Sequence, residues 1–169
     1  MSQKSEVRNQ KSKARSQKLG GLPALKILLI DDDELLARGT AKLIQRLGGH
    51  QVSITDNPVE IFQICRSGEI DAVLMDINLP GAQWQGREVS GADLAYSLKT
   101  DPQTAHVPII LVTAYAMLGE RKAFLEASQA DAFFAKPITD YQALLELIDR
   151  LVQESAGLKN SGARNQEPE

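Results

Sequence analysis

Several short apolar runs of the sequence end on polar side chains that suit phosphoryl chemistry. In chain order, these side chains are Asp31 and Asp32, Asp76, Thr113 and Lys136. Clustered carboxylates repel one another and favour a hard cation such as Mg²⁺, which prefers oxygen ligands. A lysine and a threonine hydroxyl beside them can bind an incoming oxyanion. A carboxylate in such surroundings is equipped to accept a phosphoryl group.

The elements that must position these side chains alternate between strands and helices. Apolar runs predict strands at 24–30, 51–55, 71–75, 107–113 and 131–135. Helical patterns follow them at 33–47, 58–65, 91–99, 116–129 and 139–152. This alternation predicts an α/β fold: a doubly wound, five-stranded parallel sheet with helices on both faces. Binding sites of such folds lie at the carboxyl ends of the strands, where the polar side chains fall.

Two helices carry more detailed predictions. In the helix at 33–47, the core face is predicted to hold Leu36, Leu43, Ile44 and Leu47. The last helix is predicted to begin with a capping box made by Thr139 and Gln142.

Composition indicates one domain, at 25–153, between two polar tails. The head, 1–24, holds six Lys and Arg against one Glu, and the tail spans 154–169; both are predicted to be disordered. We interpret the basic head as solubilising, with a nucleic-acid or anionic-membrane contact as the alternative. No apolar run is long enough for a membrane span, and the single Cys65 excludes an internal disulfide. The cytoplasm is the expected compartment.

Four motifs resemble those of the receiver domains of two-component response regulators. They are "LLIDDDE", "VLMDINLP", "IILVTAY" and "AFFAKP". The resemblance covers about residues 25–153 and implies the flavodoxin-like strand order 2-1-3-4-5. It implies that Asp76 is the phosphoacceptor. It also implies a Mg²⁺ ion held by Asp31, Asp32, Asp76 and the backbone carbonyl of Asn78.

The same resemblance assigns roles to the later motifs. Thr113 is the switch threonine, and Phe133 falls at the position of the switch aromatic. Lys136 is expected to contact the phosphoryl group, and the bond between it and Pro137 is expected to be cis.

The resemblance implies a single-domain response regulator rather than an enzyme, with only self-phosphorylation and autodephosphorylation of its own. The two histidines, His50 and His106, are interpreted as surface or turn residues, so a separate histidine kinase or phosphotransfer protein must supply the phosphoryl group. Output is expected through contact with a downstream protein, on the helix at 116–129, the strand at 131–135 and the last helix. A homodimer through that face is also allowed. Neither a membrane nor a nucleic acid is an expected partner.

Three other classes of protein were weighed. A dinucleotide-binding domain needs a glycine-rich turn after the first strand, where "DDDEL" stands. A haloacid-dehalogenase-like phosphatase needs a second aspartate two residues after the nucleophile, where Asn78 stands. A receiver-like module without phosphorylation would lack Asp76, Lys136 or one of the acidic pair, and all are present.

The segment 81–90 departs from the family pattern because it lengthens the loop before the third helix by about seven residues. It contains Trp84, the only tryptophan of the chain. Two interpretations stay open. Either the indole folds back on the nearest apolar surface, or the loop covers the Asp76 pocket or presents Trp84 to a partner.

Overall fold

The computed structural model describes residues 23–114 and 117–162. The predicted basic head, 1–24, lies almost wholly outside these ranges, and so do residues 163–169 of the predicted tail.

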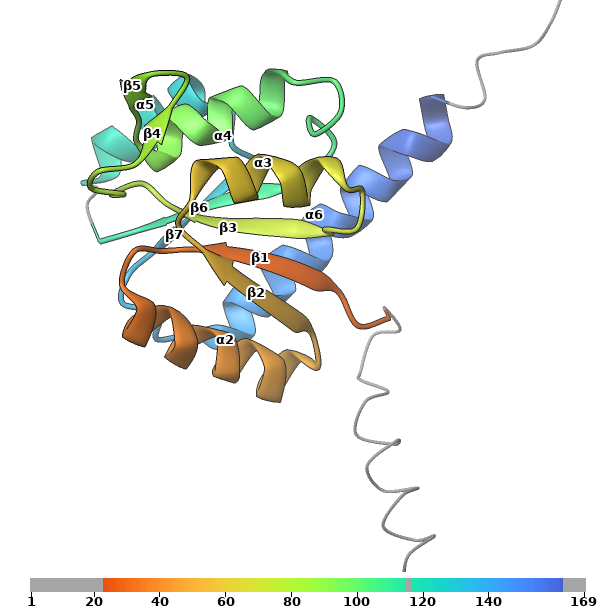
Figure 1. The fold of residues 1–169 in the computed structure, drawn as a ribbon. Coiled ribbons are helices and arrows are strands. Elements are labelled where there is room, and N and C mark those ends of the chain that lie inside the picture. Colours follow the sequence, from red (N-terminus) through yellow and green to blue (C-terminus); the bar gives the residue numbers. More distant parts are fainter. Residues whose placement is uncertain (1–22, 115–116, 163–169) are drawn as a thin grey trace, which may run out of the picture.

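One five-stranded parallel sheet forms the centre of the molecule (Figure 1). Its strands are β1 (Lys26–Ile30), β2 (Gln51–Thr55), β3 (Ala72–Asp76), β6 (Ile109–Thr113) and β7 (Ala132–Ala135). They lie in the order β2-β1-β3-β6-β7. Every residue of β3 and β6 is buried, as expected for inner strands covered on both faces. The predicted strand order 2-1-3-4-5 is therefore confirmed.

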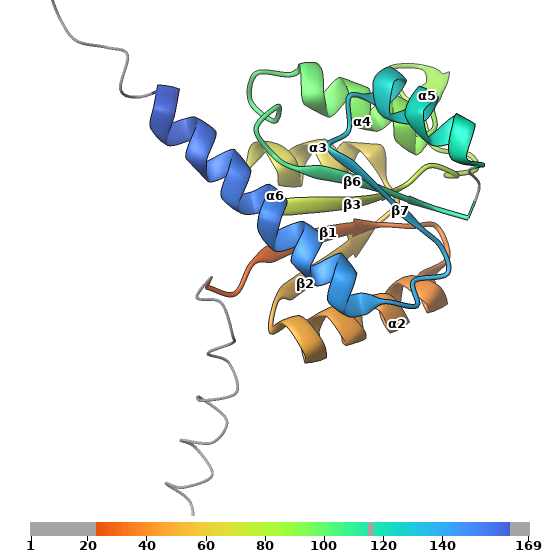
Figure 2. The same ribbon diagram turned by 180° about the vertical axis from the view of Figure 1, so that it is seen from behind.

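Helices cover both faces of the sheet (Figures 1 and 2). One face packs against α2 (Glu34–Gly48) and α6 (Tyr141–Gly162). The other packs against α3 (Pro58–Arg66), α4 (Gly91–Thr100) and α5 (Leu118–Ser128). Two apolar cores result, one on each side of the sheet, and the carboxyl ends of all five strands meet at one edge.

The predicted core face of α2 is largely wrong. Leu36, Leu43 and Leu47 are 48%, 38% and 41% exposed, while Ile44 is fully buried. The helix instead buries small residues beside Ile44: Ala37, Thr40 and Ala41. Small side chains let the helix lie close to the sheet, so the larger leucines stay at its margin.

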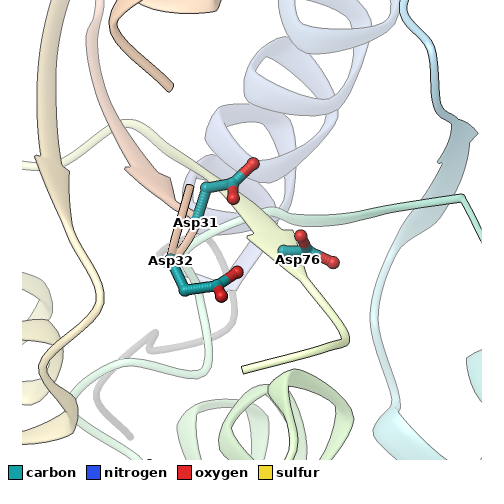
Figure 3. Close-up of side chains that lie close together, drawn as sticks. All are labelled: Asp31, Asp32 and Asp76. Atoms are coloured by element: carbon teal, nitrogen blue, oxygen red, sulfur yellow. The ribbon is translucent and has the colours of Figure 1, made fainter. Parts of the chain in front are cut away.

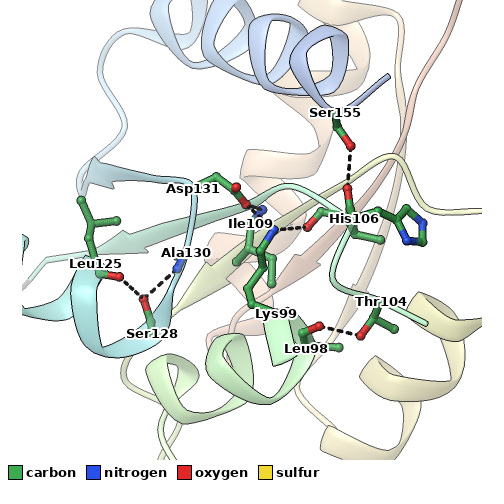
Figure 4. A network of polar contacts seen from close by, with 11 residues as sticks. Leu98, Lys99, Thr104, His106, Ile109, Leu125, Ser128, Ala130, Asp131 and Ser155 are labelled. Carbon is green, nitrogen blue, oxygen red and sulfur yellow. Dashed lines mark hydrogen bonds and ion pairs between the residues drawn. The ribbon is translucent and has the colours of Figure 1, made fainter. Parts of the chain in front are cut away.

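The predicted end of the last helix is also wrong, because α6 continues through residues 154–162 of the predicted disordered tail. Beyond the sheet it is still held at Ser155, whose hydroxyl donates to the carbonyl of His106 at 2.6 Å (Figure 4). At its start, the cap is the Asp140 carboxylate, which accepts from the Ala143 N–H at 2.9 Å. Asp140 thus takes the place of the predicted Thr139–Gln142 box.

His50 lies in the connection between α2 and β2, in agreement with its interpretation as a turn residue, but it is buried rather than at the surface. Its Nδ1 accepts a hydrogen bond from the Leu25 N–H at 3.1 Å, and its Nε2 lies 3.8 Å from Asp149 on α6. The imidazole therefore joins the start of β1 to the last helix, which is a structural role.

The long segment 81–90 forms a small hairpin of β4 (Gln83–Trp84) and β5 (Arg87–Glu88). Gln85 and Gly86 connect them, with φ angles of 52° and 77°. Two consecutive positive φ angles are typical of the two-residue turn that matches the twist of a hairpin. The Trp84 ring stacks on Phe62 of α3, with centroids 4.1 Å apart and planes 8° from parallel. The indole thus lies on the apolar surface of α3.

Candidate phosphoacceptor site

The carboxyl edge of the sheet brings three aspartates together. Asp31 and Asp32 directly follow β1, and Asp76 is the last residue of the neighbouring β3 (Figure 3). One carboxylate oxygen from each lies within 4.8 Å of the others. Asp31 and Asp76 are buried, whereas Asp32 is exposed. The cluster is therefore anchored in the core and open to solvent on the side of Asp32.

Lys136 joins the two buried carboxylates. Its Nζ lies 2.6 Å from Asp31 Oδ2 and 2.7 Å from Asp76 Oδ2. The Lys136 N–H also donates to the carbonyl of Thr113 at 3.0 Å, which fixes the end of β7 beside that of β6. The bond between Lys136 and Pro137 is cis. The Lys136 side chain, directly after β7, is thus held between Asp31, directly after β1, and Asp76 at the end of β3.

The backbone holds each buried carboxylate in the same way. Asp31 Oδ1 accepts from the N–H of Asp33, and Asp76 Oδ1 accepts from the N–H of Asn78, at 2.9 and 3.1 Å. Each acid therefore uses one oxygen for Lys136 and the other for an amide two residues later. The Asp33 side chain caps α2 by accepting from the Leu36 N–H, so the three consecutive aspartates have three different roles.

Burial shapes the ionisation of this cluster. Burial is the largest cause that raises the pKa of Asp76 above its usual value, and the nearby Asp31 charge adds to it. The hydrogen bond and the charge of Lys136 act in the opposite direction without cancelling the increase. For Lys136, burial alone lowers the pKa, but the bonds to Asp31 and Asp76 together outweigh it and raise the pKa.

The donor set fits a hard divalent cation. Three carboxylates converge, while among the described residues only Lys136 forms ion pairs with any of them. Negative charge therefore exceeds positive charge at the cluster, and carboxylate oxygens are the ligands that Mg²⁺ prefers. Asp31, Asp32 and Asp76 could hold such an ion.

Gly91, the first residue of α4, lies directly against the backbone of Asp76. A Cβ atom on Gly91 would come within 1.8 Å of the Asp76 carbonyl oxygen. The Gly91 N–H donates to the Ile77 carbonyl at 2.8 Å. Only glycine fits this close approach. The sequence contains no local signal for it beyond a glycine at the start of a helix.

The two predicted switch residues lie on neighbouring strands. Thr113 ends β6 and is buried, and it pairs with Ala135 of β7. Phe133 lies two residues before Ala135 and is partly buried on the α5 side of the sheet. The Arg121 guanidinium of α5 lies 5.1 Å from the centre of the Phe133 ring, a cation–π contact that the sequence analysis did not predict.

Among the helices that the structure describes, none has an apolar stretch long enough to cross a bilayer.

Known proteins share this fold. The model of the response regulator receiver domain matches residues 27–149. The polar-differentiation response regulator DivK of Brucella anthropi is 33% identical, over 67% of this chain and 85% of its own length. The chemotaxis protein CheY-3 of Vibrio cholerae is 29% identical, over 76% and 92%. The receiver domain of a Pseudomonas aeruginosa sensor histidine kinase, solved with magnesium in its active-site cleft, superimposes with a TM-score of 0.62 at 24% identity, over 77% and 98%. The chain belongs to the family of response regulator receiver domains.

Proposed function

We propose that Asp76 accepts a phosphoryl group from a histidine kinase or phosphotransfer protein, with Mg²⁺ bound at the same site. The observation that carries this proposal is the ion-pair arrangement in which Lys136 joins Asp76 to Asp31 beside the open Asp32. The magnesium in the cleft of the Pseudomonas aeruginosa receiver domain supports the choice of metal.

In the proposed reaction, an Asp76 carboxylate oxygen attacks the phosphorus atom of a phosphohistidine. The new O–P bond forms as the P–N bond breaks, and the electron pair of that bond leaves with the imidazole. Lys136 is already within 2.7 Å of Asp76, so it can bind a phosphoryl oxygen without large movement. Thr113, at the end of the adjacent strand, offers a hydroxyl to another oxygen. Mg²⁺ held by Asp31, Asp32, Asp76 and the Asn78 carbonyl would supply the remaining positive charge.

We expect slow hydrolysis of the phosphorylated product rather than turnover of a substrate. The protein therefore acts as a phosphoacceptor in signalling, with autodephosphorylation as its only further chemistry. We propose that output occurs by contact with a downstream protein through α5, β7 and α6, in the cytoplasm. Thr113 and Phe133 would couple Asp76 to this face, because both lie on the strands that join it to the site.

The test uses a small phosphodonor, phosphoramidate, with Mg²⁺ and intact-mass detection. Wild-type protein should gain one phosphoryl group, and EDTA should prevent the reaction. Asp76→Asn should gain none, whereas the control Asp71→Asn should react like the wild type, because Asp71 bonds to the Lys26 N–H outside the site. Equal phosphorylation of Asp76→Asn would show that Asp76 is not the acceptor.

A second measurement tests the metal ligands. Without phosphodonor, Asp32→Ala should weaken Mg²⁺ binding most, followed by Asp31→Ala. Unchanged titrations for both variants would exclude the proposed site.

A further inference from the structure

The loop between Asp76 and α4 is closed at its base. Its first residue, Ile77, accepts a hydrogen bond from the N–H of Gly91, at the loop's far end. Gly91 also lies against the Asp76 carbonyl with no room for a Cβ atom. The start of α4 is fixed in turn by Ser90 and Asp93, which accept hydrogen bonds from each other's N–H groups. Both ends of the loop are therefore held at the phosphoacceptor.

Hydrogen bonds continue from this base into the hairpin. The Ala82 N–H donates to the Leu79 carbonyl at 3.1 Å, and the Val89 N–H donates to the Ala82 carbonyl at 2.9 Å. Leu79, Ala82 and Val89 are all buried in the core under α3 and α4. The segment that carries Asn78 is thus followed directly by a hydrogen-bonded, buried unit rather than by a mobile loop.

The outer end of the hairpin is attached to α3 by an aromatic stack. Trp84 lies parallel to Phe62 at 4.1 Å, and the Arg66 guanidinium lies 5.3 Å from the centre of the same Phe62 ring. Arg66 also pairs with Asp101, the C-cap residue directly after α4, at 2.8 Å. Phe62 is only 3% exposed and cannot move independently of the core. The stack therefore links the hairpin to α3, and the Arg66–Asp101 pair links α3 to the end of α4.

We infer that Trp84 is a positioning residue for the site: by stacking on Phe62 it holds the hairpin on α3 and so sets the backbone of residues 77–79, which includes the carbonyl of Asn78. This inference rests on the proposed function, because it assigns to Trp84 an effect on the affinity for Mg²⁺. Trp84 itself belongs to the hairpin rather than to the metal-binding cluster.

The experiment compares Mg²⁺ titrations of four proteins without phosphodonor, followed by the amide NMR signals of Asn78 and Gly91. Trp84→Ala should raise the half-saturating Mg²⁺ concentration about threefold, less than the 10–100-fold typical of groups bonded directly to a metal ligand. Trp84→Phe, which keeps an aromatic ring on Phe62, should restore most of the affinity. The control Ile64→Ala removes apolar contact from the same core on α3 at a residue outside the Trp84–Phe62 stack, and should bind Mg²⁺ like the wild type.

Each outcome decides the inference. Weaker binding for Trp84→Ala, with rescue by Trp84→Phe and no change for Ile64→Ala, supports it. Unchanged binding for Trp84→Ala overturns it. Equal weakening for Ile64→Ala also overturns it, because the loss of Mg²⁺ affinity would then come from a general loss of stability rather than from the stack. Should Trp84→Ala not fold, Trp84→Leu takes its place with the same expectations. A wild type that binds Mg²⁺ but accepts no phosphoryl group would refute the proposed function and leave the role of Trp84 intact.

Discussion

Replacing Gly91 by alanine should destabilise the protein, because the new methyl group has no space. Its carbon would lie 1.8 Å from the Asp76 carbonyl oxygen and 2.9 Å from the Ile77 Cα, both backbone atoms that no rotamer change can move away. Overpacking of this kind costs up to about 3 kcal/mol. The displaced Gly91 N–H would also lose its bond to Ile77, worth about 1 kcal/mol. Alanine gains at most about 1 kcal/mol from its helix propensity. The expected net loss is about 3 kcal/mol.

Gly39→Ala is the matched control for this prediction. Gly39 lies in the middle of α2, and an added Cβ would meet no heavy atom within 4 Å. The same substitution should therefore stabilise the protein there by about 0.5–1 kcal/mol. Urea unfolding followed by circular dichroism gives both values. If Gly91→Ala proved as stable as the wild type, the close approach of α4 to the Asp76 backbone would be refuted.

Three further predictions concern charge, the thiol and the core. Burial, together with the Asp31 charge, raises the pKa of Asp76 above its ordinary 3.8. The folded protein therefore binds this proton more tightly than the unfolded chain does. The stability that results is complete below pH 3.8 and is lost as the pH rises through the pKa of the folded state. In EDTA, Asp76→Asn should therefore unfold at higher urea concentration than the wild type near neutral pH, and an equal or lower midpoint would contradict this. Burial raises the pKa of Cys65 from 9.0 to about 12, so the wild type should lose more stability between those pH values than Cys65→Ala does. Its thiol should react with a disulfide reagent only on unfolding, and rapid reaction of the native protein would disprove its burial. Ile44→Ala should lower the free energy of unfolding by about 2–5 kcal/mol, because Ile44 is fully buried. Leu35→Ala, at an 85% exposed site, should lower it by less than about 0.5 kcal/mol. Similar urea midpoints for the two variants would contradict the observed orientation of α2.

The sheet was predictable because strand-forming runs and strand ends are local properties of the sequence. Parallel strands place their carboxyl ends at one edge, so the convergence of Asp31, Asp76 and Lys136 followed from the alternation of elements. The same reasoning could not find Gly91, because its requirement arises from the backbone of Asp76 and Ile77, which is distant in sequence, rather than from its own neighbours along the chain.

The errors in α2 and α6 have different physical origins. Periodicity ranks side chains by their hydrophobicity, whereas packing selects them by size when a helix lies close to a sheet. Ala37 and Ala41 therefore displaced Leu36 and Leu43 from the core. The end of α6 was missed because its sequence is polar and its contact at Ser155 is made to a carbonyl, which leaves no trace in side-chain patterns.

The adjacent ends of the loop 77–91 make the hairpin tip a site where the chain can be lengthened. Because Gly91 is bonded to Ile77, residues added at the tip need not separate the two ends. Each doubling of a flexible loop costs only about 0.6 kcal/mol in closure entropy. The turn at Gln85–Gly86 is exposed and lies beyond the Trp84–Arg87 pair. An epitope or a fluorescent reporter peptide grafted between Gln85 and Gly86 would therefore be displayed at the hairpin tip without separating Ile77 from Gly91.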